Sequence, residues 1–131
     1  MDVKRISRAW IVQSKDDWEV VQSLFEKKHY PHALFFCHLA LEKFIKAIIV
    51  RRTKHHSPYS HDLLLLAQEA GLDADARKRR QLAEINTFNI RARYDDVKRA
   101  FSRKAKRAYA EKYVEISNDL IKWLKKEFRK K

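Results

Sequence analysis

The chain alternates between long amphipathic stretches and short polar breaks, and the spacing of its apolar residues is helical. Residues 2–28 carry apolar side chains three and four positions apart, which predicts one long first helix. Pro31 suits the first turn of a new helix, because its fixed φ is helical and its missing N–H is not needed there. Residues 31–52 are apolar nearly all round, which indicates a central helix covered on several sides.

A polar connection ending in Pro58 leads into two shorter helices. Ser60 is expected to cap the first of them, which stops at Gly71. Asp73 is expected to cap a fourth helix over residues 74–92, whose apolar positions are sparser and whose basic run faces water at least in part.

The last third of the chain is predicted to hold a loop and one long helix. Residues 93–103 show no clear period and are interpreted as the loop. Ser102 is expected to cap a helix over residues 104–129. Its predicted buried stripe recurs every three or four residues: Tyr109, Tyr113, Ile116, Leu120 and Trp123. Five helices, three long and two shorter, predict an all-α up-and-down bundle forming one domain over residues 1–131.

The composition argues against several other architectures. The 131 residues include one Gly and two Pro, whereas tight hairpins, phosphate-cradling loops and nucleophile elbows depend on Gly. The longest apolar tract, residues 33–50, is interrupted by charged residues, so no membrane span is expected. A lone cysteine, Cys37, and an N-terminus without a signal-peptide pattern predict a cytoplasmic location.

The chain is strongly basic. Thirty Lys and Arg against seventeen Asp and Glu give a formal net charge of +13 and a pI near 10.0. This favours polyanionic partners such as RNA, DNA or an acidic protein, and it is equally typical of adaptation to high growth temperature. Residues 97–131 hold thirteen Lys or Arg against four Asp or Glu, a net charge of +9, so general RNA binding through this part is a further possibility.

The central helix contains a stripe of polar residues. His38, Glu42 and Lys46 are each four positions apart, and Lys43 lies beside them. The stripe is either the solvent side of the helix or a polar seam at a subunit or ligand interface. Because this helix offers so few polar positions, we favour the seam, without inferring catalysis from it.

The six histidines do not form a metal-binding pattern. Four are interpreted as solvent-exposed or capping residues: His29, His32, His55 and His56. None belongs to the spaced set of ligands that a structural zinc site needs, so we expect no metal and no cofactor. His61, followed by Asp62 at a helix start, is a more specific pattern, and local capping is its simplest explanation.

A second polar group follows the fourth predicted helix. Arg91 and Arg93 lie beside Tyr94 and the carboxylates of Asp95 and Asp96. An arginine that binds phosphate next to a stacking tyrosine is one interpretation. The other interpretation is that Arg93 pairs with one of the carboxylates, and the residue types alone favour this pairing.

The order of these segments resembles the HEPN domain family. The resemblance is carried by residues 30–33, 38–47, 60–63 and 92–95, followed by Trp123, and it covers nearly the whole chain. It implies an all-helical bundle that forms a two-fold dimer and is often encoded beside a small nucleotidyltransferase in prokaryotic toxin–antitoxin pairs. Many members of the family are metal-independent ribonucleases, and others bind nucleotides or act as non-catalytic partners.

The ribonuclease members carry an Arg followed a few positions later by a His, and here the sequence departs from them. Arg91 and Arg93 match the region of that Arg, but no His follows His61, and Lys98 is the nearest basic residue. A lysine keeps its proton near neutral pH, so it can hold a phosphate but is a poor base. The resemblance therefore predicts a homodimeric module that binds nucleotide or RNA phosphate through Arg91, Arg93, Tyr94 and Lys98, paired with a nucleotidyltransferase-like protein. The alternative is a metal-independent ribonuclease that uses Arg93 with Arg91 or Lys98.

Overall fold

A computed structural model describes residues 1–89 and 95–130, and within these ranges the chain forms six helices and no strand. Three are long: α1 (Val3–Glu26), α2 (Tyr30–Thr53) and α6 (Arg107–Arg129). Three are short: α3 (Leu63–Glu69), α4 (Ala76–Asn86) and α5 (Asp95–Lys104). The predicted all-α bundle is confirmed, with six helices in place of five. In the described part of the chain, no helix is long and apolar enough to cross a membrane.

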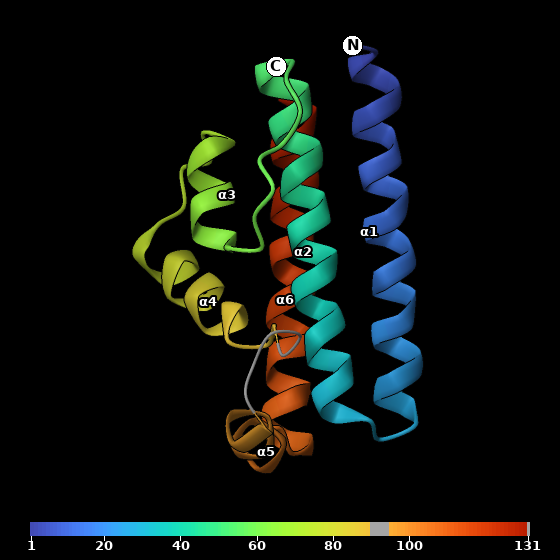
Figure 1. Ribbon diagram of the computed structural model, residues 1–131, viewed down its shortest axis with the longest axis vertical. Coiled ribbons are helices and arrows are strands. Elements are labelled where there is room, and N and C mark those ends of the chain that lie inside the picture. Colours follow the sequence, from blue (N-terminus) through green and yellow to red (C-terminus); the bar gives the residue numbers. More distant parts are fainter. Residues whose placement is uncertain (90–94, 131) are drawn as a thin grey trace.

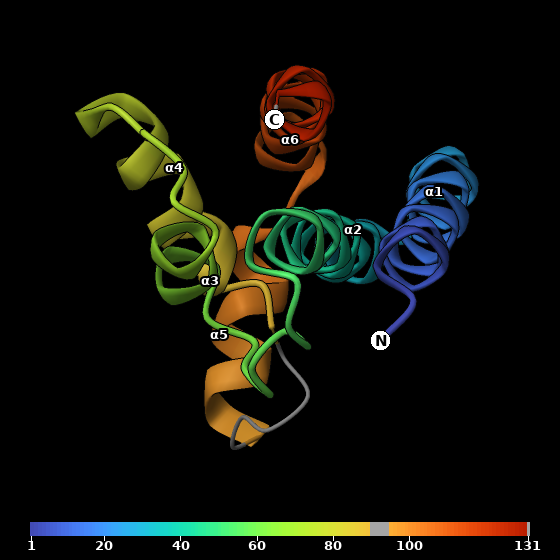
Figure 2. The ribbon, with the colours of Figure 1, turned by 90° about the horizontal axis from the view of Figure 1, so that it is seen from above.

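Helix α2 is the centre of the molecule. The long helices α1, α2 and α6 run side by side (Figure 1), and the view from above places α2 between α1, α6 and the α3–α4 pair (Figure 2). Every residue from Cys37 to Val50 except Lys43 is buried. The apolar surface all round α2, which predicted a central helix, is therefore covered by neighbours on several sides.

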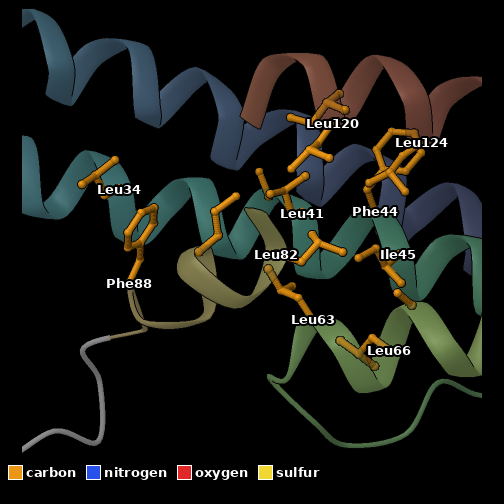
Figure 3. Close-up of a cluster of buried hydrophobic side chains, with 14 of the residues drawn as sticks. Leu34, Leu41, Phe44, Ile45, Leu63, Leu66, Leu82, Phe88, Leu120 and Leu124 are labelled. Carbon is orange, nitrogen blue, oxygen red and sulfur yellow. The ribbon is translucent and has the colours of Figure 1, made fainter. Parts of the chain in front are cut away.

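The core lies on two faces of α2. On one face, Leu63 and Leu66 of α3 and Leu82 of α4 pack toward it, and on another face Leu120 and Leu124 of α6 do so (Figure 3). All five are at most 2% exposed. Burying a leucine side chain contributes about 1.5–3 kcal/mol, so these contacts anchor the short helices α3 and α4 to the long ones.

The capping residues of α3 and α4 differ from the predicted ones. Asp62, not Ser60, caps α3, and its Oδ1 accepts from the backbone N–H groups two and three residues on, at 3.0 and 3.4 Å. The Ser60 hydroxyl oxygen instead accepts from the N–H of Asp62. Asp75, not Asp73, caps α4. At both sites an aspartate at the cap adds a favourable interaction with the positive end of the helix dipole.

The region predicted as a loop contains α5. Its Phe101 is 6% exposed, and its ring lies 5.6 Å from that of Phe88, so one aromatic side chain fixes this short helix to the core. Ser102 lies inside α5 and caps nothing, while Lys106 is the capping residue of α6. The prediction was wrong because two to three turns are too short to establish a hydrophobic period.

Two further boundaries also differ. Helix α4 ends at Asn86, before residue 92. Along α6, Leu120 is the one fully buried member of the predicted stripe, while its aromatic members and Ile116 are half-buried. The fully buried face also includes Ala110, Ser117 and Leu124, so it is rotated from the prediction toward α2.

Candidate functional site

The polar stripe of α2 lies inside the protein. His38, Glu42 and Lys46 are 0%, 4% and 5% exposed, which excludes the interpretation of this stripe as the solvent side of the helix. Buried charges of this kind are tolerated only when they are paired and hydrogen-bonded.

Glu42 provides that pairing and also reaches outside its own helix. Its Oε2 accepts a hydrogen bond from Nζ of Lys46 at 3.1 Å, and its Oε1 accepts one from Nδ1 of His61 at 2.9 Å. Nε2 of His38 donates to the backbone carbonyl of His61 at 2.8 Å. Helix α2 thus holds His61 by both its ring and its backbone, and we name His38, Glu42, Lys46 and His61 the Glu42 cluster.

The cluster also reaches α1. The ammonium group of Lys46 lies 5.3 Å from the ring centroid of Trp10, a cation–π contact between α2 and α1. Lys43 is separate, because its Nζ contacts Oδ2 of Asp17 in α1 at 2.7 Å. The predicted seam of four α2 residues is therefore two arrangements, with Lys43 outside the Glu42 cluster.

His61 is the exposed edge of the cluster. Its side chain is 36% exposed, and its ring lies 5.7 Å from that of Tyr59, which is 95% exposed. Because a carboxylate paired with Lys46 can only accept, Nδ1 of His61 carries a hydrogen, and Nε2 is the ring nitrogen that points away from Glu42. Local capping was the simplest explanation of His61, but Asp62 makes the cap and His61 binds Glu42.

The end of α4 is fixed beside this edge. Asn86, the last residue of α4, donates from Nδ2 to Oδ1 of Asp62 at 2.9 Å and accepts from the N–H of Leu63 at 2.8 Å. One side chain therefore ties the end of α4 to the start of α3, directly after His61. Sequence reasoning missed Asn86, since nothing in its neighbourhood distinguishes it from any polar residue near a helix end.

The residues predicted to bind phosphate have different outcomes. Arg91, Arg93 and Tyr94 lie outside the described residues, so their roles stay predictions. Lys98 belongs to α5 and is half-buried. Arg91 and Arg93 follow five and seven residues after Asn86, the last residue of α4, along the chain.

A second polar group joins the three C-terminal helices. Glu84 of α4 contacts Nζ of Lys104 at 2.8 Å and accepts a hydrogen bond from the hydroxyl of Tyr109. Burial alone would raise the pKa of Glu84, but these two hydrogen bonds and the charge of Lys104 hold it below its usual value. Burial and the Glu84 carboxylate raise the pKa of Tyr109. The polar groups of these three side chains pair with one another, and the contacts link α4, α5 and α6.

A large cleft lies elsewhere, where the chain's N-terminus meets the C-terminal ends of α2 and α3. Its volume is about 910 Å³. Arg52 in its wall donates to backbone carbonyls of Ala70, Gly71 and Glu127, next to the ends of α3 and α6. Helix C-termini favour cations, which accounts for the basic residues that the ends of α2 and α6 contribute to the lining of the cleft. The basic side chains that line it are Lys4, Arg51, Arg52, Lys54 and Lys130.

Comparison with known proteins gives the family. The HEPN domain family matches residues 7–127. The chain belongs to the HEPN domain family. No curated protein matches it significantly. The HEPN fold of this chain is similar to the crystal structure of TT1696 from Thermus thermophilus, with a TM-score of 0.77 and 18% identity over 92% of this chain and 97% of that one. At this identity the likeness concerns the fold alone. Among the described residues of this HEPN domain, no group of three His, Cys, Asp or Glu side chains is placed to hold a metal ion.

Proposed function

We propose that this HEPN protein is a homodimeric binding module for the phosphate groups of a nucleotide or of RNA, working without a cofactor. The observation that carries the proposal is the junction at Asn86. It fixes the end of α4 beside Asp62, next to the partly exposed His61, and the sequence leads from there to Arg91 and Arg93. Arginine is suited to this task because its planar guanidinium binds phosphate oxygens in pairs.

The charge of the chain supports the same function. A net charge of +13 attracts any polyanion, and the net +9 of residues 97–131 concentrates that attraction in the C-terminal third. Attraction of this kind is not selective. A defined phosphate site is therefore distinguished from diffuse charge by one basic residue whose removal weakens binding more than removal of the others.

Replacing Arg93 by Ala tests the proposal. We expect binding of a fluorescently labelled RNA oligonucleotide, or of a nucleotide, to weaken by about 1–3 kcal/mol, the range for a charge-assisted hydrogen bond. Lys130→Ala is the matched control, because it also removes one positive charge but acts on a cation that pairs with Glu127 at 2.7 Å and lines the separate cleft. Fluorescence anisotropy measures both. An equal loss for the two variants would contradict a defined site and favour general RNA binding by the basic surface.

A metal-independent ribonuclease is the second candidate, and the oriented imidazole of His61 favours it. In this version Arg93, with Arg91 or Lys98, handles the phosphate that is cleaved. Our proposal expects the wild type to bind RNA and leave it intact, and Lys98→His is the substitution most suited to create cleavage. Robust cleavage by the wild type, lost in Arg93→Ala, would establish the ribonuclease instead.

The proposal includes two protein partners. The first is a second copy of the chain, and sedimentation at micromolar concentration should give twice the chain mass of 15.7 kDa. A clean monomer would contradict this.

The second partner is a nucleotidyltransferase-like protein in a cytoplasmic pair of the toxin–antitoxin type. Such a reading frame beside the gene, with a product that co-purifies with this chain, would support the pairing.

A further inference from the structure

The Tyr59–His61 pair is an exposed feature that packing does not explain. Tyr59 is 95% exposed, and the two rings meet edge to face, with centroids 5.7 Å apart and planes at 64°. A lone exposed tyrosine is ordinary. This one, however, adjoins an imidazole whose orientation is fixed from the protein interior by Glu42 and His38.

The fixed imidazole presents a defined hydrogen-bonding group. Nδ1 donates to Glu42, so in the tautomer with hydrogen on Nδ1 alone Nε2 is an acceptor, and no described residue bonds to it. A phosphate oxygen would need a donor at this position, which the tautomer with hydrogen on Nδ1 alone does not supply. A hydroxyl group, in contrast, can donate its hydrogen to the lone pair of Nε2.

We propose that Tyr59 and His61 form a subsite that selects ribonucleotides over deoxyribonucleotides. The base stacks on the exposed ring of Tyr59, and the ribose 2′-hydroxyl donates a hydrogen bond to Nε2 of His61. Glu42 is a positioning residue, because it fixes the tautomer without touching the ligand. The subsite rests on the proposed function, since the phosphate site supplies the general affinity and this pair supplies the preference for ribose. The 2′-hydroxyl is the group by which proteins distinguish RNA from DNA.

Three single strands of one base sequence and length test the subsite: oligouridine RNA, the deoxyuridine strand, and the 2′-O-methyl RNA. All three carry the same bases and number of phosphates, so non-specific attraction is matched. The 2′-O-methyl strand keeps the 2′-oxygen but lacks the hydrogen that the hydroxyl would donate. By fluorescence anisotropy, we expect the wild type to bind RNA about 2- to 10-fold more tightly than the other two, the fold-change that one hydrogen bond provides.

The variants separate the two roles. His61→Ala should remove the preference for RNA, whereas Tyr59→Ala should weaken all three strands by about 5- to 100-fold, the loss of one stacked base, and leave some of the preference. His56→Ala, a change of an exposed histidine in the same connection, should alter neither quantity. If His61→Ala lowers the folded fraction, all three apparent affinities fall alike, so their ratio still reports the subsite.

The possible outcomes have distinct meanings. Equal binding of RNA and deoxyuridine strands by the wild type, or an unchanged preference in His61→Ala, would overturn the subsite while leaving the phosphate site standing. Failure of all three strands to bind, or binding that Arg93→Ala does not weaken, would overturn the proposed function itself. A preference for RNA that His61→Ala abolishes and His56→Ala preserves is the result we expect.

Discussion

Replacing Lys46 by Met probes the energetic coupling of the Glu42 cluster. The side chains of Lys46 and Glu42 are 7% and 5% exposed, and 3.1 Å separates Nζ from Oε2. Met is similar in length, and it can still pack against Trp10, so the main change is the loss of the positive charge beside a buried carboxylate. Removing one partner of a buried ion pair costs about 3–5 kcal/mol, because the other charge stays buried without compensation.

We expect the lower end of that range for Lys46→Met. His61 still donates to Oε1 of Glu42 at 2.9 Å, so the carboxylate keeps one of its two hydrogen-bond partners. A loss of about 3 kcal/mol corresponds to a fall in Tm of roughly 10 °C in a chain of this size. The double variant Glu42→Leu/Lys46→Met removes both charges and fills their space with apolar atoms. It should therefore be more stable than Lys46→Met alone.

Urea unfolding followed by circular dichroism measures both variants and the single Glu42→Leu. The coupling free energy is the difference between the loss in the double variant and the sum of the two single losses. A loss below about 1 kcal/mol in Lys46→Met would be the value of a solvent-exposed pair. That result, or losses that simply add, would refute the argument that these groups form one buried unit.

Two other predictions concern titratable groups. The lowered pKa of Glu84 stabilises the folded protein above the ordinary pKa of 4.5, and this stabilisation is lost as the pH falls through the lowered pKa. Glu84→Gln should therefore be less stable than the wild type near neutrality, and the difference in unfolding free energy should narrow in acid. A difference that stays constant with pH in urea titrations would contradict this. Burial raises the pKa of the Cys37 thiol to about 12, so a thiol reagent at pH 8 should label Cys37 only after unfolding. Rapid labelling of the native protein would contradict its burial.

The strongest periodic signals predicted the fold well. An apolar surface all round residues 31–52 has one explanation in a chain this short, a helix packed on several sides, and α2 confirms it. Helix α5 gave no such signal, because it is short and anchored chiefly by Phe101, whose partner Phe88 comes from another part of the chain. The caps of α3 and α4 were misplaced by two residues, since two capping residues compete at each start.

The candidate site, too, was predicted in part: the residues of one helix were found, and their partner from another part of the chain was not. Spacing of four residues placed His38, Glu42 and Lys46 on one stripe. The same reasoning added Lys43 to the seam, whereas in the structure Lys43 pairs with Asp17 of α1. The contact of Glu42 with His61 joins residues 19 positions apart. It depends on how the connection after α2 folds back along that helix, which no local pattern encodes.

The position of α1 at the margin of the bundle has a consequence for the order in which the protein opens. Helix α1 packs chiefly on α2, whereas α2 also contacts α3, α4, α5 and α6. Besides apolar packing, three polar contacts attach α1 to α2. The Ser14 hydroxyl donates to the carbonyl of Ala40, Asp17 pairs with Lys43, and the Trp10 ring makes the cation–π contact with Lys46. Detaching α1 would leave the remaining five helices in contact, so we expect α1 to open as a separate cooperative unit with its own free energy of opening. Its backbone amides should exchange with solvent deuterium through this partial opening, whereas the amides in the middle of α2 should exchange only through global unfolding.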